Sequence, residues 1–388
     1  MLNKNDTVLI ICHYTNLEDR VNSIGPPQDL RKFLLKRVKK ITYILLPFPY
    51  AVDTRCYIDR YENGKLVHAK QTLRLRGHDW LQYLTHPFVV VYISLITSPH
   101  TVCFALDNLS TLSVLPLRII GLVKKVVYYS IDYTPQRFPN KIMNFLYQTS
   151  DKIACATADV NWVLSQPMLK IKQTRKFFIG QQAVFYKVPM GFPKKHISVQ
   201  PVEKIDRYHL VFAGVLLEKQ GMQLVLQSLP KLLTYYPKLH LTIIGSGEYE
   251  DHLKKITRVN KLNSVVKFNG YIANHRKIEA ILTKCGIGLA PYQPDPASYT
   301  YFADPMKPKI YLGCGLPVII TNVPPIARII EKNGAGVIMK YSVESFILSV
   351  KQILKNSNRY VRYRKTAIKL SEKYDAEKIL KDALSKTF

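Results

Sequence analysis

The chain has 388 residues, of which 47% are apolar and 21% charged, so it is long and apolar enough for two domains and is neither disordered nor fibrous. Lysine and arginine number 56 against 27 aspartates and glutamates, a formal net charge of +29. This excess favours polyanionic partners such as nucleic acid, an anionic membrane face or phosphorylated substrates. The six cysteines stand singly, without a C-x-x-C pair. We therefore expect neither a disulfide framework nor a structural zinc site, and a reduced cytoplasm fits.

Neither the start of the chain nor its longest uncharged stretch predicts a membrane segment. Met1–Asp6 is polar, so no secretory signal is expected. Trp80–Leu106 contains no Asp, Glu, Lys or Arg, but Pro87 and Pro99 interrupt it. A spanning helix needs about 20 apolar residues in a row. We expect a helix end followed by two buried strands in this stretch, and no membrane span.

The first half has the pattern of an irregular α/β domain. Its expected strands are Thr7–Cys12, Phe88–Ile93, Thr101–Ala105, Val126–Ser130, Lys152–Cys155 and Ala183–Val188, with a helix near Gln28–Lys39. Tyr57–Tyr61 and Leu66–Lys70 flank the dipeptide Asn63-Gly64, which is a strong hairpin signal. The first half is therefore predicted to be Rossmann-like, with an added β-hairpin.

The second half alternates more regularly between short apolar runs and helical spacing. The expected strands are Tyr208–Gly214, Leu239–Gly245, Val265–Gly270, Gly286–Pro291, Leu316–Thr321 and Gly336–Met339. Helices are expected between them, at Met222–Leu233, Tyr249–Val259, His275–Lys284, Lys307–Leu312 and Pro325–Lys332. Such alternation indicates βαβ units and a doubly wound parallel sheet. The polar, aperiodic stretch Pro193–Asp206 is the expected linker.

Three motifs of the second half resemble the donor-site segments of GT-B glycosyltransferases, particularly the retaining family-4-type enzymes (glycosyl transferases group 1). The most specific is residues 304–319, DPMKPKIYLGCGLPVI, a polar helix start followed by a small-residue turn and a Gly-x-Pro-Val-Ile strand. Residues 212–221, FAGVLLEKQG, resemble the family's phosphate loop, and residues 245–248, GSGE, its second glycine turn. The resemblance covers roughly residues 208–340 well and the first half only loosely.

The resemblance implies a GT-B fold of two Rossmann-like domains facing across a cleft. The N-terminal acceptor domain is expected at residues 1–195 and the nucleotide-sugar donor domain at 196–358. A C-terminal helical segment, 359–388, is expected to pack back toward the N-terminal domain.

The same motifs predict the donor site. Glycine lets backbone N–H groups approach a phosphate, and the following helix N-terminus favours negative charge. Transfer from a nucleotide sugar needs stabilisation of a diphosphate leaving group, by a metal or by cations and N–H groups. The sequence has no Asp-x-Asp motif, so we expect no metal and assign Lys219, which matches the family's loop lysine, a catalytic role. The other expected donor-binding residues are Gly214, Gly245, Gly247, Asp304, Lys307, Lys309 and Tyr311.

Departures from the family pattern indicate a divergent branch. Val215 stands where the family has its loop arginine, and Phe302 and Ile310 replace the two glutamates of its E-x7-E pair. The residues Ser130–Tyr133 occupy the strand end where the family's N-terminal histidine motif is expected. Whether these losses abolish activity is left open by the sequence.

On the acceptor side, the candidates follow predicted strands of the first half. Gly25 and Gln28 lie between a strand and a helix, and Tyr133 follows Asp132 after the strand Val126–Ser130. A carboxylate at Asp132 is suited to act as a base on the acceptor hydroxyl or to orient the sugar. The alternatives are a plain turn at Gly25 and a helix-capping role for Asp132. His13 is a further candidate, although a lone histidine is more often structural.

Lysines and arginines cluster in the helix expected near Gln28–Lys39, between Asp159 and Glu203, where no acid intervenes, and in residues 351–388, with 11 Lys/Arg to 4 Asp/Glu. Basic surfaces with interleaved Tyr, Phe and Leu suit docking on an anionic leaflet. The alternative is a lysine-rich solvated surface.

The predicted function is transfer of a hexose-type sugar from a UDP- or GDP-linked donor to a lipid-linked or surface-glycan acceptor. We expect it to be metal-independent, to proceed with retention, and to take place on the inner face of the cell membrane in cell-envelope polysaccharide synthesis. A GT-B epimerase acting on a nucleotide sugar and a non-catalytic basic module remain alternatives. A nucleic-acid partner is not expected, because the charge is dispersed over both halves and no RRM, KH or zinc-finger signature occurs.

Overall fold

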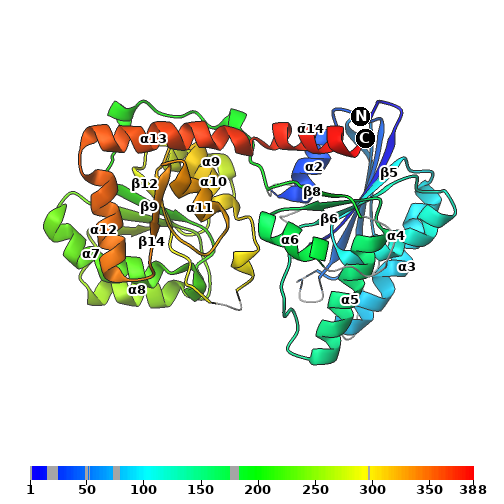
Figure 1. Ribbon diagram of the computed structural model, residues 1–388, viewed down its shortest axis with the longest axis horizontal. Coiled ribbons are helices and arrows are strands. Elements are labelled where there is room, and N and C mark those ends of the chain that lie inside the picture. Colours follow the sequence, from blue (N-terminus) through cyan, green and yellow to red (C-terminus); the bar gives the residue numbers. More distant parts are fainter. Residues whose placement is uncertain are drawn as a thin grey trace. The chain divides into compact units, whose positions relative to one another are not determined.

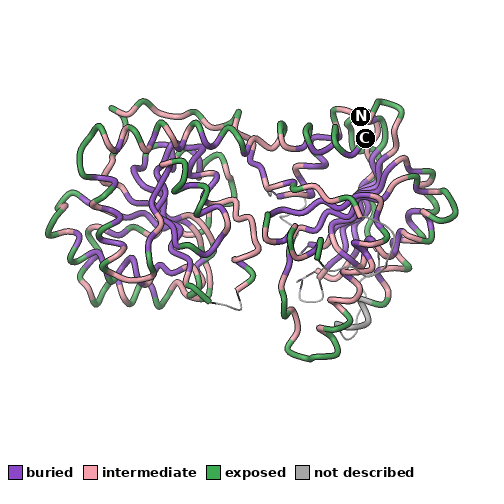
Figure 2. The backbone as a smooth tube through the Cα atoms, in the orientation of Figure 1, coloured by how far each residue is buried: buried purple, intermediate pink, exposed green. Residues whose placement is uncertain are grey.

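The computed structural model describes residues 2–14, 25–48, 51, 53–72, 79–174, 183–295 and 298–388. The chain divides into two compact units (Figure 1). Unit 1 comprises Met1–Met190 and Glu377–Phe388, and unit 2 comprises Gly191–Ala376. Each unit has its own sheet, whose buried strands form the purple centres of Figure 2. The predicted α/β fold class, with two parallel-sheet domains, is confirmed.

Unit 1 contains an eight-stranded sheet in the order β4-β3-β2-β1-β5-β6-β7-β8, parallel except for a β3–β4 hairpin at one edge. The strands are β1 Thr7–Tyr14, β2 Lys40–Pro47, β3 Tyr57–Glu62, β4 Lys65–Gln71, β5 Val102–Ala105, β6 Val126–Ser130, β7 Val160–Val163 and β8 Phe185–Lys187. The hairpin was predicted correctly, with Asn63 and Gly64 both at positive φ in its turn.

Helices cover both faces of this sheet. They are α2 Pro26–Leu34, α3 Asp79–Thr97, α4 Asn108–Ile119, α5 Lys141–Thr157, α6 Gln166–Thr174 and α14 Ala376–Thr387. On one face α3, α4 and α5 contribute Val90, Val114 and Ala154 to a common core. On the other, the Trp162 indole N–H of β7 donates to Thr387 Oγ1 of α14 at 2.9 Å. The final helix is thereby part of unit 1.

Two strand predictions in unit 1 are wrong. Phe88–Ile93 lies inside α3, and Lys152–Cys155 lies inside α5. The run of valines after Pro87 has a strand-like composition, but in the structure His86, Val90, Ile93 and Ser94 are buried. This spacing of four, seven and eight residues is that of one helix face. Tertiary packing against the sheet therefore overrides local β propensity.

Unit 2 contains a six-stranded, wholly parallel sheet in the order β11-β10-β9-β12-β13-β14. The strands are β9 His209–Ala213, β10 His240–Ile244, β11 Val266–Phe268, β12 Ile287–Ala290, β13 Val318–Thr321 and β14 Gly336–Met339. All six match predicted strands within one or two residues at each end. The order turns back between β9 and β12, and α/β sheets bind ligands beside such a switch point.

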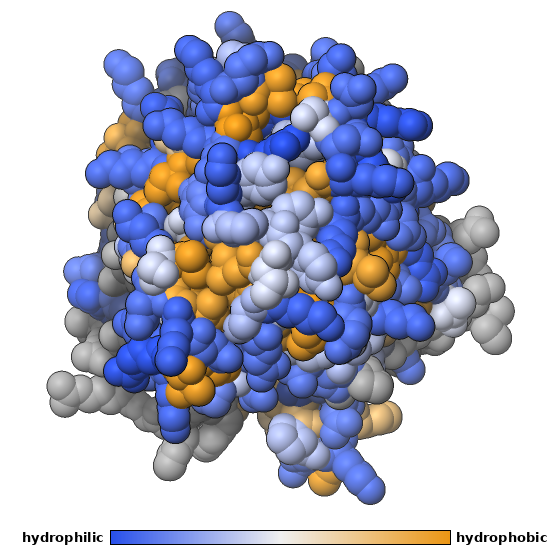
Figure 3. All heavy atoms as spheres, turned by 90° about the vertical axis from the view of Figure 1, so that its left-hand side faces the viewer, coloured by the Kyte–Doolittle hydropathy of each residue, from blue (hydrophilic) through white to orange (hydrophobic). Residues whose placement is uncertain are grey.

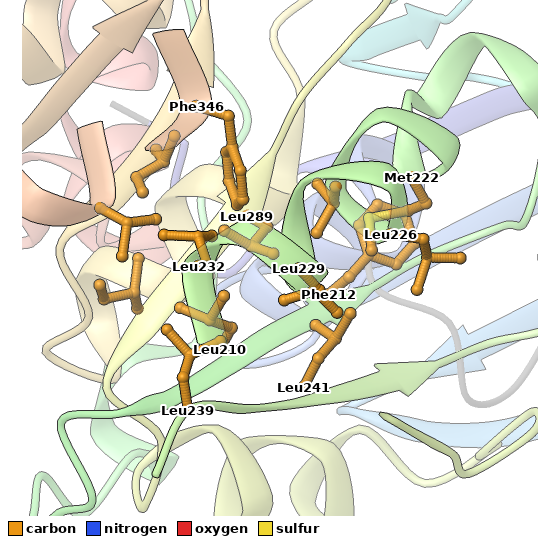
Figure 4. Packing of buried hydrophobic residues seen from close by; sticks show 14 of the residues in the cluster. Leu210, Phe212, Met222, Leu226, Leu229, Leu232, Leu239, Leu241, Leu289 and Phe346 are labelled. Atoms are coloured by element: carbon orange, nitrogen blue, oxygen red, sulfur yellow. The ribbon is translucent and has the colours of Figure 1, made fainter. Parts of the chain in front are cut away.

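Two layers of helices enclose the sheet of unit 2. The helices are α7 Met222–Tyr235, α8 Glu250–Val259, α9 His275–Leu282, α10 Met306–Gly313, α11 Ile326–Lys332, α12 Val343–Leu354 and α13 Ser357–Ser371. Figure 4 shows one of the two cores, in which Leu226 and Leu229 of α7 pack on Leu210 and Leu241 of the sheet, beside Phe346 of α12. The other core includes residues of α9, α10, α11 and α13.

The predicted C-terminal segment 359–388 is divided between the units. Helix α13 belongs to unit 2, because the buried Arg364 donates to the carbonyl oxygens of Gly315 at 2.8 Å and Gln200 at 2.6 Å. Only α14 belongs to unit 1. Of the segment predicted to pack back toward the N-terminal domain, the part from Glu377 onward belongs to unit 1.

Buried histidines give the stability of unit 1 a pH dependence. His100 is 2% exposed, and burial lowers its pKa from 6.5 to about 4. Between these two pH values the unfolded chain holds a proton that the folded chain excludes, so the free energy of unfolding falls as the pH falls, by about 3 kcal/mol for a shift of this size. In urea titrations between pH 7 and pH 5, His100→Gln should show a shallower fall than the wild type. The exposed His68→Gln should not. Equal slopes for all three proteins would contradict this assignment.

Candidate donor site

The glycine turns predicted to approach a phosphate lie together at the carboxyl ends of β9 and β10. Gly214 and Gly245 both have positive φ, and the Gly214 N–H donates to the Ile244 carbonyl at 2.9 Å. A Cβ on Gly245 would lie 1.9 Å from the Gly214 carbonyl oxygen, and one on Gly247 would lie 2.3 Å from that of Leu216. The two turns therefore interlock through backbone contacts that only glycine permits.

The backbone of residues 218–221 also lies close to the backbone that follows β12. Gly221, at φ 77°, lies between the short 3-10 turn η3 (Glu218–Gln220) and α7. A Cβ on it would lie 1.8 Å from the Pro291 carbonyl oxygen. The Gln293 N–H donates to the Lys219 carbonyl at 2.9 Å. The ends of β9, β10 and β12 thus converge on one group of loops.

Gly221→Ala should destabilise the protein more than Gly334→Ala. Both glycines have φ near +70°, where alanine costs about 1–2 kcal/mol, but a Cβ on Gly334 meets nothing within 4 Å. The difference between the two variants therefore isolates the clash with Pro291. Urea unfolding followed by intrinsic fluorescence measures both, and equal losses would show that the loop after β12 moves aside freely.

Lys307 lies at the start of α10, directly under the Gly214 turn. Its Nζ donates to Gln220 Oε1 at 2.6 Å and lies 3.8 Å from the centre of the Phe212 ring. A Cβ on Gly214 would be 3.0 Å from Lys307 Cε. No carboxylate among the described residues forms an ion pair with this ammonium, and burial lowers its pKa well below the ordinary lysine value. An anion placed against the turn would restore the charge, as a diphosphate would.

Lys219 has a different environment from Lys307. It is exposed on η3, with its Nζ 4.9 Å from the centre of the Tyr299 ring. Its neighbour Gln220 accepts a hydrogen bond from Lys307, so the short turn that carries Lys219 also contacts Lys307. Val215, in the place of the family's arginine, is 58% exposed. The sequence did not indicate Gln220 or Phe212, although Gln220 follows the lysine of the matched motif directly.

Two of the predicted donor-binding residues are structural in this arrangement. Lys309 is fully buried and pairs with Asp304, its Nζ 2.5 Å from Oδ2. The hydroxyl of Tyr311, 1% exposed, accepts the Ala213 N–H at 2.8 Å and so fixes the end of β9. Side chains buried this deeply do not reach a bound nucleotide in this structure. The expectation that Lys309 and Tyr311 contact the donor directly is therefore corrected. The side chain of Asp304 is 10% exposed, and its carboxylate forms an ion pair with Lys309.

The acceptor-side candidates in unit 1 are not gathered into one site. Asp132 is exposed and pairs with Arg137 at 2.6 Å. Tyr133 is 2% exposed, and Gly25 and Gln28 are buried at the start of α2, where Gly25 precedes the helix in an extended conformation. Burial corrects the expectation that Tyr133, Gly25 and Gln28 contact an acceptor in this conformation. Asp132 remains accessible.

The candidate His13 lies in a cluster of polar side chains at the carboxyl ends of β1 and β5. His13 Nδ1 lies 2.8 Å from Asp107 Oδ2, and His13 Nε2 lies 3.3 Å from His86 Nδ1 of α3. Asp107 also caps α4 by accepting the Ser110 N–H at 2.8 Å. The carboxylate fixes the orientation of the imidazole. The sequence analysis named His13 as a candidate, but it did not indicate Asp107 or His86 as its neighbours.

Comparison with known proteins finds one family that matches most of unit 2. The sequence profile of the family described as Glycosyl transferases group 1 matches residues 194–370. An uncharacterized glycosyltransferase of Haemophilus influenzae is 21% identical over 258 residues, which are 66% of this chain and 66% of that protein. This is slightly less than two thirds of that relative's length.

Solved structures of low sequence identity share the fold over nearly the whole chain. Sucrose-phosphate synthase from Thermosynechococcus elongatus superposes with a TM-score of 0.71 at 14% identity, covering 99% of both chains. Anabaena HepE, solved in complex with UDP, gives 0.67 at 12% identity over 98% of this chain and 99% of its own. The pneumococcal O-GlcNAc transferase GtfA, in complex with UDP and GlcNAc, gives 0.61 at 13%, covering 89% of this chain and 69% of its own. The chain therefore has the two-domain GT-B fold of these structures, and most of its second unit matches the glycosyl transferases group 1 family.

Proposed function

We propose that this protein is a glycosyltransferase, which moves a hexose-type sugar from a nucleotide-sugar donor, UDP-linked in the first instance, to a lipid-linked or surface-glycan acceptor. The observation that carries the donor assignment is Lys307, a partly buried lysine whose Nζ donates to Gln220 and lies against the Gly214 turn. HepE binds UDP and UDP-glucose, and GtfA binds UDP and GlcNAc. These neighbours favour a UDP-linked donor over the GDP-linked alternative.

The proposed mechanism relies on fixed positive charge at the leaving group. As the bond from sugar to diphosphate breaks, negative charge grows on the phosphate oxygens, where Lys307 and Lys219 stabilise it. With retention of configuration, the leaving phosphate itself takes the proton of the acceptor hydroxyl. The donor side then needs no strong side-chain base. Asp132 of unit 1 is the accessible carboxylate proposed to orient the acceptor.

The proposal includes metal independence and a peripheral position on an anionic cytoplasmic membrane face. The support for the first is that lysines lie beside the glycine turns and that the sequence has no Asp-x-Asp motif. The support for the second is the net charge of +29. None of the described helices is both long and apolar enough to cross a bilayer.

A donor screen tests the proposed activity. Purified protein is incubated with UDP-, GDP- and dTDP-hexoses, with and without a lipid extract, and release of the nucleoside diphosphate is measured in the presence and absence of EDTA. We expect release from UDP-sugars, stimulated by the extract and unaffected by EDTA. Epimerised donor without net release would favour the GT-B epimerase instead. Nucleotide binding without any turnover would favour a non-catalytic module.

A further inference from the structure

The helices covering one face of the unit 1 sheet leave an apolar surface uncovered. On α3 the exposed side chains are Leu84, Phe88, Tyr92, Leu95 and Ile96, and Phe88 is 77% exposed. They recur every three to four residues, so they form one stripe along the helix, opposite the buried Val90 and Ile93. Exposed apolar side chains scattered singly are ordinary, but a continuous stripe marks an interaction site.

The next two helices along the chain also expose apolar side chains. Helix α4 packs on both α3 and α5. The first two turns of α5 expose Ile142, Phe145 and Leu146, with Ile142 71% exposed, and α4 ends at the exposed Ile119 and Ile120. We call the exposed apolar side chains of α3 and of the first turns of α5 the α3–α5 face. In contrast, the face of unit 2 turned toward the viewer in Figure 3 is mainly hydrophilic, and its apolar side chains lie in small separate patches.

The charges near the α3–α5 face are positive. Residues 80–150 contain five Lys/Arg and only two Asp. Both aspartates have a partner, because Asp107 pairs with His13 and Asp132 pairs with Arg137. Lys141 directly precedes Ile142 and Lys124 follows Ile120 closely, and both lysines are exposed. Apolar and aromatic side chains bordered by lysines complement an anionic lipid surface, with its acyl chains below negatively charged headgroups.

The α3–α5 face also borders the ligand-binding end of the sheet. The contact of His86 with His13 places the beginning of α3 beside the carboxyl end of β1. The loop carrying Asp132 leads directly into α5. A lipid-linked acceptor emerging from a bilayer at this face would therefore reach the carboxyl ends of the unit 1 strands, the end at which α/β sheets bind ligands.

We propose that the α3–α5 face docks on an anionic bilayer by inserting Phe88, Tyr92, Ile142 and Phe145 among the lipid headgroups. The inference rests on the proposed function, because it supplies the surface from which a lipid-linked acceptor is presented. The inference adds that apolar side chains contribute to membrane binding and that these side chains belong to unit 1. Salt therefore weakens binding but does not abolish it, since screening acts on the charges alone.

Vesicle co-sedimentation tests this with charge-matched variants. The docking variant is Phe88→Glu with Phe145→Glu. The control is Val259→Glu with Leu348→Glu, two equally exposed apolar residues of unit 2. On vesicles of phosphatidylcholine with phosphatidylglycerol, the docking variant should bind at least tenfold more weakly than wild type, and the control within about twofold of it. Wild type should bind pure phosphatidylcholine more weakly and retain measurable binding to the anionic vesicles at 0.5 M salt.

Several outcomes would overturn the proposal. These are equal losses in both variants, unchanged binding of the docking variant, or complete release of wild type by salt. A dimer seen by sedimentation without lipid and dissociated by the docking variant would make the face a contact between copies of the chain. Circular dichroism and hydrolysis of donor in solution verify that the variants fold. Donor hydrolysis needs no lipid, so the two proposals can fail separately. If the wild type hydrolyses donor but does not bind vesicles, the membrane inference is wrong. If it binds vesicles but does not hydrolyse donor, the proposed activity is wrong.

Discussion

Removing either lysine of the donor site should lower kcat by roughly 10²–10³, the usual loss when one group that stabilises transition-state charge is deleted. The variants are Lys219→Ala and Lys307→Met, assayed for UDP release at saturating donor. Lys219 belongs to the turn in which Gln220 accepts from Lys307 Nζ at 2.6 Å. Lys332→Met, on the exposed side of α11, is the matched control and should retain wild-type turnover.

Thermal stability distinguishes a binding role from a structural role for Lys307. Partial removal of an ammonium from water without a counter-ion opposes folding, so Lys307→Met should melt at the same temperature as wild type or higher while losing turnover. Burial lowers the pKa of Lys307, and a bound diphosphate raises it again. At a pH above the lowered pKa, Lys307 should therefore take up a proton when UDP binds. Calorimetry in buffers of different ionisation enthalpy measures the uptake. Unchanged turnover, or a marked loss of stability, would remove Lys307 from the donor site.

The largest loss of stability is expected at the buried pair of Lys309 and Asp304. Removing one partner of a buried ion pair costs about 3–5 kcal/mol, because the remaining charge is left without compensation. Asp304→Leu should therefore lower the free energy of unfolding by this amount, as measured by urea denaturation. Adding Lys309→Met should recover most of it, since a well-packed apolar pair replaces an ionic one at little cost.

The exposed pair Glu250 and Lys254 of α8 serves as the control for this measurement. Glu250→Leu should leave the unfolding midpoint nearly unchanged, because solvent screens a surface pair. If Asp304→Leu instead left the fold intact and raised the KM for the donor, Asp304 would bind donor directly, as the sequence motif predicts. No recovery in the double variant would show that Asp304 stabilises the loop through partners other than Lys309.

Local patterns were sufficient for unit 2 and insufficient for part of unit 1. The strands of unit 2 are short apolar runs bounded by glycine or polar residues, and the helices between them have clear helical periodicity, so each element was visible from its own sequence. In α3, the apolar run after Pro87 has strand composition, and its helical form follows from packing Val90 and Ile93 on the sheet. Strand β2 was not predicted either, although it is buried beside β1.

The sequence by itself determined the α/β class, the parallel order of βα units in the second half, the resemblance to glycosyltransferases and the glycine turns at the strand ends. Only the tertiary structure decided which side chains near those turns are accessible. Lys307 and Lys309 are two residues apart, yet successive positions on a helix point in different directions. One meets the Gly214 turn, and the other enters the core and meets Asp304. Burial depends on contacts between segments distant in sequence, and a local motif does not indicate which segments these are.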